Sequence, residues 1–205
     1  MTTRGMCAHL TVNERRIFRR LSTPARIQNF LEELTINFAD TNRSPRCVLR
    51  EKRAHCFEGA LFAAAALWYH GERPLILDLR STRDDDDHVV ALFRRRGCWG
   101  AISKTNHAVL RYREPIYRTI HELVLSYFHE YFLDDGRKTL RSYSRPFDLL
   151  KRGDTWVTTE QNLRPLADAL DDSPHFDLFS RRIISGFRRA DAIEIRVGKI
   201  VEWPR

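Results

Sequence analysis

The sequence predicts an α+β domain in which a central helix packs against an antiparallel sheet, with further helices on its flanks. Residues 55–69 are apolar on most sides of a helix, which is typical of a buried central helix. Two short apolar segments with the length of strands follow it, at residues 74–79 and 88–93. The short connection at residues 94–97 leads to a further strand at residues 99–103, which predicts an antiparallel hairpin.

The composition is that of an ordinary globular protein. The chain has 205 residues, of which 42% are hydrophobic and 30% are charged, and this size fits a single domain at residues 1–205. No apolar run reaches the roughly 20 residues that span a bilayer, and the N-terminal segment lacks the apolar core of a secretory signal. The cysteines fit neither a zinc ribbon nor a dense disulfide framework: Cys7, Cys47, Cys56 and Cys98. We therefore expect a cytoplasmic protein with reduced thiols and no contact with a membrane.

The net charge of +8 raises the expectation of anionic partners. The arginines are scattered in small groups and do not form one tract interleaved with aromatic residues. No nucleic-acid-binding motif is visible. Solvated arginine faces explain this charge better, so we do not expect a nucleic-acid partner.

Helix signals precede the central helix. Thr11 followed by Glu14 fits a capping box at the start of a first helix. Thr23 can cap a second helix, with Pro24 at its first helical position. The apolar residues of this second helix fall on one face: Ile27, Phe30, Leu31 and Leu34. Residues 46–53 are basic and irregular, and they lead into the central helix.

The chain after the hairpin predicts a mixture of elements. Residues 107–112 predict a further strand, and residues 114–132 predict a long helix. Apolar and polar residues alternate around residues 198–199, which predicts a terminal hairpin. We therefore divide the domain into a core at about residues 22–133 and a loop-rich extension at residues 134–205 that ends in this hairpin.

The central hairpin makes a geometric prediction about two polar side chains. If its turn is even and centred between Arg95 and Arg96, His88 lies opposite Ser103. Directly opposed residues share a face of the sheet, with Cβ atoms about 4.5–5.5 Å apart. The Ser103 hydroxyl would then lie beside the imidazole, whereas a slip of one residue would separate them. Asn106, just past the strand end, is the other candidate at this edge.

Cysteine at a helix start and histidine at a strand start are the two parts of a thiol nucleophile. Cys56 opens the central helix, and both a helix N-terminus and an imidazolium lower the pKa of a thiol from its ordinary value of about 8.5. His88 is the better candidate for the base, because His55 adjoins Cys56 on a different helical bearing. Spacing alone favours another interpretation, in which Cys56 is a small core residue and His88 a strand histidine with satisfied hydrogen bonds.

Three segments of the sequence resemble the transglutaminase-like superfamily, which belongs to the papain-like thiol enzymes. They read AHCFEGALFAAAAL, DHVVALF and GCWGAIS, and the resemblance covers residues 50–112. It implies that Cys56 is the nucleophile and His88 the base. In the family an aspartate on the next strand orients the histidine, and at that place, after Trp99, this chain has Ser103.

The departure from the family pattern concerns this third catalytic position. Ser103 can orient an imidazole by a hydrogen bond, but it cannot stabilise the positive charge of the ring as a carboxylate does. Asn106 can orient the ring too, as asparagine does in papain-like sites. The predicted catalytic residues are therefore Cys56, His88, Ser103 and Asn106.

These residues predict thiol-dependent acyl transfer or hydrolysis at an amide or peptide-like bond. The substrate would be a peptide, a protein or a small amide, and we expect no cofactor and no metal. The alternative is a catalytically inactive transglutaminase-like fold that binds a peptide or protein. The acidic run at residues 84–87 fits a solvated loop better than a calcium or magnesium site. A zinc site of Cys56, His88 and an aspartate would lack the usual paired spacing of ligands.

Overall fold

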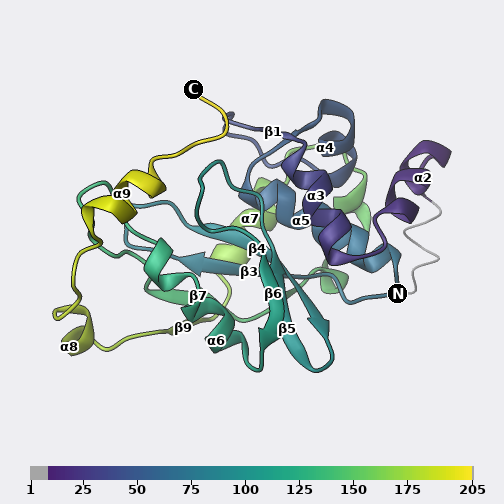
Figure 1. Cartoon of the computed structure of the whole chain (residues 1–205). Coiled ribbons are helices and arrows are strands. Elements are labelled where there is room, and N and C mark those ends of the chain that lie inside the picture. The colour runs from purple at the N-terminus through teal and green to yellow at the C-terminus, as the bar shows by residue number, and fades with distance from the viewer. Residues whose placement is uncertain (1–8, 205) are drawn as a thin grey trace.

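The structure is a computed structural model that describes residues 9–204, and it combines helices with strands (Figure 1). The α-helices are α2 (Val12–Arg20), α3 (Pro24–Glu32), α4 (Pro45–Glu51), α5 (Cys56–Tyr69), α6 (Ile120–Leu125), α7 (Arg164–Asp171), α8 (Arg181–Ile184) and α9 (Ala192–Gly198). The strands are β1 (Thr35–Ile36), β2 (Arg53–Ala54), β3 (Leu75–Arg80), β4 (His88–Arg95), β5 (Cys98–Ile102), β6 (Arg113–Tyr117), β7 (Ser142–Ser144), β8 (Phe147–Asp148) and β9 (His175–Asp177). Short 3₁₀ helices are η1 (Phe128–Glu130), η2 (Leu149–Arg152) and η3 (Thr155–Val157).

Seven strands of the described chain form one sheet. Their order is β6–β5–β4–β3–β7–β9, with β8 also paired to β3, and every neighbouring pair is antiparallel. The strands β1 and β2 form a separate parallel pair directly before α5. The predicted α+β class is therefore confirmed.

The helix α5 covers one face of the sheet and α6 the other. On the α5 face the buried apolar side chains of the sheet are Ile76, Val89, Ala91, Phe93, Ile102 and Phe147. On the α6 face they are Leu77, Leu79, Val90, Leu92 and Ala101. The helices α2, α3 and α4 pack around α5, and residues 57–68 of α5 are all buried, as expected for a central helix (Figure 1).

The first helices begin where the sequence predicts. Thr11 accepts a hydrogen bond from Glu14 N, and the Glu14 carboxylate accepts one from Thr11 N at 2.7 Å, which closes the capping box. Thr23 caps α3 in the predicted way. The segment predicted as irregular before α5 is instead largely helical, because Ser44 caps α4 by accepting from Cys47 N at 3.3 Å.

A glycine lets the first turn of α5 approach the chain that follows β5. A Cβ atom at Gly59 would lie 2.5 Å from the Cβ atom of Lys104, closer than side chains tolerate. Lys104 is fully buried, and its ammonium group donates to Leu34 O at 2.7 Å. This contact holds the start of α5, with Cys56, against the end of the β4–β5 hairpin.

The turn of that hairpin is not where the sequence analysis expects it. Its two central residues are Arg96 and Gly97, with φ of 52° and 85°, and Arg95 pairs with Cys98. A two-residue turn with positive φ at both positions matches the twist of the flanking strands, and glycine adopts such a φ without strain. The predicted register is therefore wrong by two residues.

This shift leaves His88 and Ser103 on the same face of the sheet. Continued beyond β5, the observed register places Ser103 opposite Val90 and not opposite His88. Because strand side chains alternate with a period of two, a displacement by two residues exchanges neighbours but not faces. Ser103 thus lies diagonal to His88, within reach of its ring.

Two predictions for the chain after the hairpin are wrong. Residues 107–112 belong to no strand of the described chain, and only an isolated bridge forms there. The long helix predicted at residues 114–132 is instead β6, α6 and η1. Pro115 lies in β6 at the edge of the sheet, where a residue without a backbone N–H is tolerated. Ile116, on the apolar stripe of the predicted helix, is 68% exposed.

The chain after residue 133 contributes to the same sheet through β7, β8 and β9. The predicted terminal hairpin is wrong, because this segment forms α9. Asp191 and Glu194 close a capping box at its start, with Asp191 N donating to the Glu194 carboxylate at 2.6 Å. Nowhere in residues 9–204 is there a helix with the length and apolar character that crossing a bilayer requires.

Candidate active site

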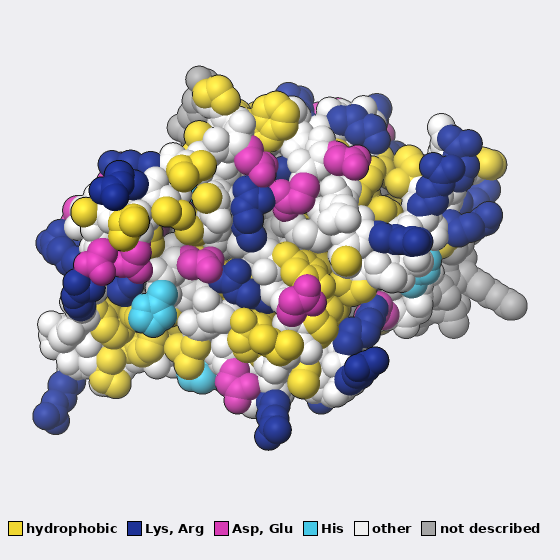
Figure 2. Space-filling model, viewed as in Figure 1, with side chains coloured by type: hydrophobic (Ala, Val, Ile, Leu, Met, Phe, Trp, Pro, Cys, Tyr) yellow, Lys and Arg dark blue, Asp and Glu magenta, His cyan; other side chains and the backbone are white. Residues whose placement is uncertain are grey.

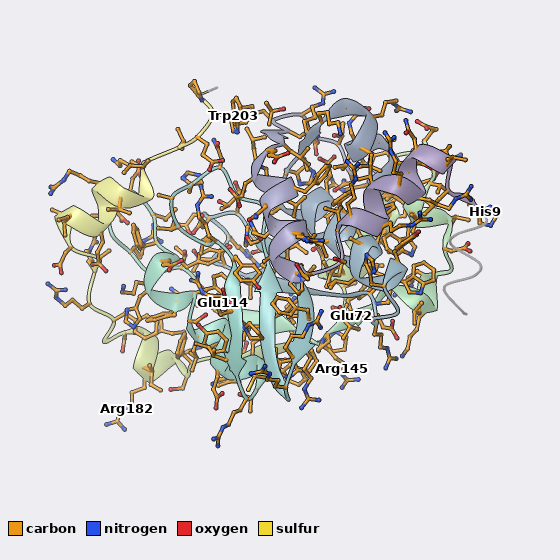
Figure 3. The ribbon with its side chains drawn as sticks, turned by 45° about the vertical axis from the view of Figure 1, so that its right-hand side comes forward. His9, Glu72, Glu114, Arg145, Arg182 and Trp203 are labelled. Atoms are coloured by element: carbon orange, nitrogen blue, oxygen red, sulfur yellow. The ribbon has the colours of Figure 1, made fainter. Side chains whose placement is uncertain are left out.

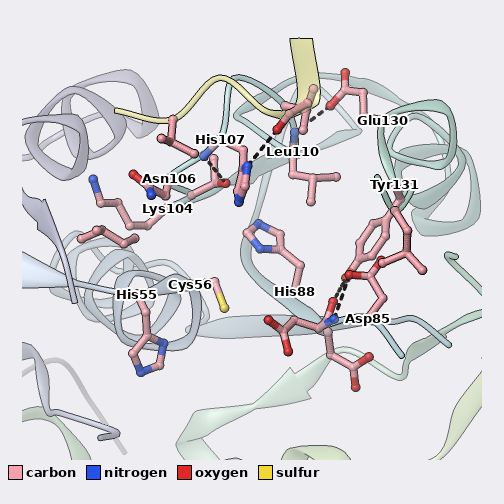
Figure 4. Close-up of a pocket in the computed structure, with 18 of the residues that line it drawn as sticks. His55, Cys56, Asp85, His88, Lys104, Asn106, His107, Leu110, Glu130 and Tyr131 are labelled. Atoms are coloured by element: carbon pink, nitrogen blue, oxygen red, sulfur yellow. Dashed lines mark hydrogen bonds between the residues drawn. The ribbon is translucent and has the colours of Figure 1, made fainter. Parts of the chain in front are cut away.

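A cleft of about 1020 Å³ opens at the first turn of α5 (Figure 4). Cys56 lines it from α5, His88 from the first position of β4, and Asn106 from the chain that follows β5. Ser103, the fourth residue predicted from the sequence, is 1% exposed and bonds to His88. The structure thus brings all four predicted residues to one region. Ser103 bonds to His88, whereas Asn106 bonds to Trp203.

A buried carboxylate shapes the first turn of α5. Glu58 is fully buried, and Asn37 Nδ2 donates to both of its oxygens, at 3.1 and 2.9 Å. Arg43 N donates to it at 2.9 Å, His55 N at 3.1 Å and Thr41 Oγ1 at 3.2 Å. These bonds fasten the preceding loop to the helix start. Glu58 was not predicted as a site residue, although a glutamate in this place is the signal of a capping box.

The ring of His55 is held against the thiol of Cys56. Its Nε2 lies 2.5 Å from Thr41 O, and because a carbonyl only accepts, Nε2 carries a proton. The same atom lies 3.6 Å from a Glu58 oxygen, so Nδ1 is the atom left for the thiol. Burial lowers the pKa of His55, but hydrogen bonding to Cys56 and the charges of Cys56 and Glu58 outweigh it and raise the pKa to about 9. The ring is therefore cationic at neutral pH.

The side chain of Cys56 lies between His55 and His88 (Figure 4), and both rings affect the pKa of its thiol. Burial raises the pKa of the thiol, but hydrogen bonds from the two rings and their positive charges outweigh burial and lower the pKa to about 5. The N-terminus of α5 acts in the same direction, because its unpaired N–H groups favour an anion. Cys56 is therefore a thiolate at neutral pH, and it is only partly buried.

Two consecutive hydrogen bonds orient His88. The Ser103 hydroxyl donates its one proton to Leu110 O at 2.6 Å, so it accepts from the His88 ring, whose Nε2 lies 2.8 Å away. Nε2 therefore carries a proton, and Nδ1 is the ring nitrogen left to exchange a proton in the cleft. Gln28 fixes the backbone of Ser103 through its amide, at 3.0 Å to the N–H and 2.8 Å to the carbonyl.

The side chain of Asn106 bonds elsewhere. Its Nδ2 donates to Trp203 O, and its Oδ1 accepts from Trp203 N, both at 2.9 Å. The orienting bond to His88 therefore comes from Ser103 and not from Asn106. The chain leaves the sheet after Ile102, so the alternation of strand side chains does not carry Asn106 toward the histidine.

The acidic run before β4 braces the loop that leads to His88. Asp84 pairs with Arg137 at 2.6 Å, and Asp87 accepts from Ser81 N at 2.7 Å. These bonds fasten both ends of the acidic run to neighbouring parts of the chain. Across residues 9–204, no group of three or more His, Cys, Asp or Glu side chains is arranged to hold a metal ion.

The arrangement can perform nucleophilic chemistry. A thiolate faces the cleft beside the ring of His55, whose Nε2 proton is held by Thr41, and the ring of His88, whose Nδ1 can exchange a proton. These are the parts of a Cys–His site. No protein-family model matches the chain, and a search of curated proteins finds no similar sequence. The function proposed below is therefore argued from the chemistry of these side chains.

Proposed function

We propose that the protein is a thiol enzyme that performs acyl transfer or hydrolysis at an amide or peptide-like bond. The observation that carries this proposal is Cys56 at the start of α5, beside two imidazoles, with a thiol pKa of about 5. A thiolate is the nucleophilic form of cysteine. The order of a cysteine-bearing helix, a histidine strand and an adjacent antiparallel strand supports the proposed membership of the transglutaminase-like superfamily.

In the proposed reaction His88 Nδ1 first takes the proton of the Cys56 thiol, which gives a thiolate and an imidazolium. Cys56 Sγ then attacks the carbonyl carbon, and a C–S bond forms as the carbonyl oxygen takes up negative charge. Backbone N–H groups at the start of α5 are suited to stabilise this oxyanion. His88 Nδ1 gives a proton to the leaving amine as the C–N bond breaks, which leaves a thioester. Water or a second amine then attacks the thioester and loses a proton to His88, and Cys56 departs as the thiolate.

The two histidines have different tasks in this scheme. His55 is held by Thr41 and Glu58 and stays cationic, so it stabilises the thiolate without taking part in proton transfer. His88 is oriented by the Ser103 hydroxyl, which accepts from Nε2, so Nδ1 is the nitrogen that can transfer a proton to the leaving group.

Acylation by p-nitrophenyl acetate tests the proposal. Near neutral pH we expect a burst of p-nitrophenol and one acetyl group on the peptide that contains Cys56, located by mass spectrometry. Cys98 is an internal control, because it is also partly exposed. Cys56→Ser should lose the burst, and His88→Ala should slow it about a hundredfold, because general acid–base catalysis contributes at least that much. Acetylation of Cys56 no faster than that of Cys98 would refute the proposal and favour a non-catalytic binding module.

A further inference from the structure

A short segment of the chain lies along the cleft like an added strand. Residues 199–204, called the strap below, follow α9 and pass the chain that follows β5 (Figures 1 and 4). Two backbone N–H···O bonds, at 3.0 and 2.9 Å, join residues 106–108 to residues 200–202. They flank an antiparallel bridge between His107 and Val201. This is the pattern of two antiparallel strands around a pair of directly opposed residues.

The side chain of Asn106 extends this pairing to Trp203. Its amide accepts from Trp203 N and donates to Trp203 O. A carboxamide carries one acceptor and a donor in a single plane, so it matches the peptide backbone whatever side chain the bound residue has. Residues 106–108, called the peptide edge below, are therefore complementary to the backbone of an extended polypeptide.

The strap is held by these polar bonds and by partial burial of its apolar side chains. Ile200 is 59% exposed, Val201 42% and Trp203 37%. Figure 2 shows hydrophobic side chains on the surface where α9 and the strap lie, and Figure 3 shows Trp203 near the outer end of the chain. Because these apolar side chains are only partly buried, the strap is held less firmly than the core, and another polypeptide that makes the same backbone bonds can compete for its place.

The strap and the thiol belong to the same cleft. Val201 and Trp203 line it together with Cys56 and His88. A polypeptide in the place of the strap would therefore border the cleft that holds the nucleophile. We expect the paired strap to limit the access of large reagents to this cleft.

We propose that the peptide edge is a binding site for an extended polypeptide, and that the strap occupies this site when no such ligand is present. The inference rests on the proposed function in one respect: the bound polypeptide acts as the acyl donor to Cys56 only if the protein is a thiol enzyme. The inference then limits the substrate to extended peptide segments among all amides. Because the strap is tethered, it competes at high effective concentration, and the ligand binds after the strap is released.

Proline at position 202 releases the strap without touching the peptide edge. Glu202→Pro removes the N–H that donates to Asn106 O, and Glu202→Ala is the matched control. Both variants lose the ion pair of Glu202 with Arg111, at 2.8 Å, but only the proline variant loses the backbone bond. We expect Glu202→Pro to speed the labelling of Cys56 by a bulky maleimide about fivefold over Glu202→Ala, as the loss of one hydrogen bond implies.

A peptide supplied in trans then tests the site directly. The probe is the acetylated and amidated peptide KIVEWP, the sequence of residues 199–204, with a fluorescent label. We expect saturable binding to Glu202→Pro by fluorescence anisotropy, and a return of Cys56 labelling to the slower rate. Asn106→Ala in the same background should weaken binding about tenfold, because it removes both amide bonds. The peptide KIVPWP has proline in the place of Glu202, so it lacks the N–H that donates to Asn106 O. It should bind at least about fivefold more weakly.

The inference and the proposed function can fail separately. No binding of KIVEWP to Glu202→Pro would overturn the peptide edge. Unchanged labelling of Cys56 in both Glu202→Pro and a second release variant, Trp203→Pro, would overturn the proposal that the strap occupies the edge. Binding of KIVEWP without any acylation of Cys56 by p-nitrophenyl acetate would support the edge and refute the enzyme. Acylation of Cys56 without binding of KIVEWP would support the enzyme and overturn the edge.

Discussion

The charge of His55 can be removed while its hydrogen bond is kept. In the substitution His55→Gln, the side-chain amide can still donate to Thr41 O, but it carries no charge. The thiol pKa of Cys56 is lowered from 9.0 to about 5 against the opposing effect of burial, and His55 is one of the two rings responsible. A unit charge at 4 Å is worth about 4 kcal/mol near a protein surface, or about 3 pKa units, and solvent at this partly exposed site reduces that figure. We therefore expect the variant thiol to have a pKa of about 7.

The rate of alkylation of Cys56 by iodoacetamide, followed by mass spectrometry across pH, reports this pKa because only the thiolate reacts. In the wild type the rate should reach half of its maximum near the thiol pKa of about 5. At about pH 6 some nine-tenths of the wild-type thiol is ionised but only about one-tenth of the variant thiol, so the variant should react about tenfold more slowly. At about pH 9 both thiols are ionised and the rates should converge, which distinguishes the loss of a charge from misfolding.

A histidine at the other end of α5 supplies the matched control. His70 Nε2 lies 2.8 Å from Phe18 O, a carbonyl contact like that of His55. His70→Gln should leave the alkylation profile of Cys56 unchanged. If His55→Gln also leaves the half-maximal rate near pH 5, His55 does not stabilise the thiolate, and the division of tasks between the two histidines is wrong.

Three further substitutions test the framework of the site. Gly59→Ala should lower the free energy of unfolding by about 2–3 kcal/mol in urea titrations, because the added Cβ meets a buried lysine, whereas Gly186→Ala should change it little. Ser103→Ala should slow acylation by p-nitrophenyl acetate about tenfold and leave iodoacetamide alkylation nearly unchanged, since the ring of the base loses its orientation but the thiolate keeps its other partners. Glu58→Gln should destabilise the fold by about 3 kcal/mol, because its amide N–H₂ would face backbone donors, and Glu33→Gln on the exposed surface should not; equal urea midpoints for the two would contradict this.

Local signals predicted the elements that depend on local chemistry. The capping box of Thr11 and Glu14 and the all-round apolar character of α5 need no tertiary information, and both predictions are confirmed. Prediction failed where the same apolar residues fit both the spacing of a helix and that of a strand. The apolar residues of the segment after β5 fit a helix by spacing, yet Pro115 and its neighbours form an edge strand because the β4–β5 hairpin offers them a free edge.

The role of His55 was underestimated for an identifiable reason. If both residues were helical, the side chains of His55 and Cys56 would point in different directions. His55 is the N-cap of α5 and has extended backbone dihedrals, φ −95° and ψ −173°, so its side chain does not follow the helical rotation. A residue placed just before a helix can therefore lie beside the first helical side chain.

The pairing of His88 with Ser103 shows which part of a site depends on register and which does not. The predicted register was wrong, but the error was an even number of residues, and alternation then keeps both side chains on one face. The turn sets this face, because Gly97 at positive φ favours a two-residue loop, whereas an odd shift would put the two side chains on opposite faces. The direction of the Ser103 hydroxyl is a different matter, since it is set by the carbonyl of Leu110 from a loop that no local pattern predicts. The sequence therefore determines that these two side chains meet, whereas the tautomer of His88, and with it the nitrogen available for catalysis, follows only from the folded chain.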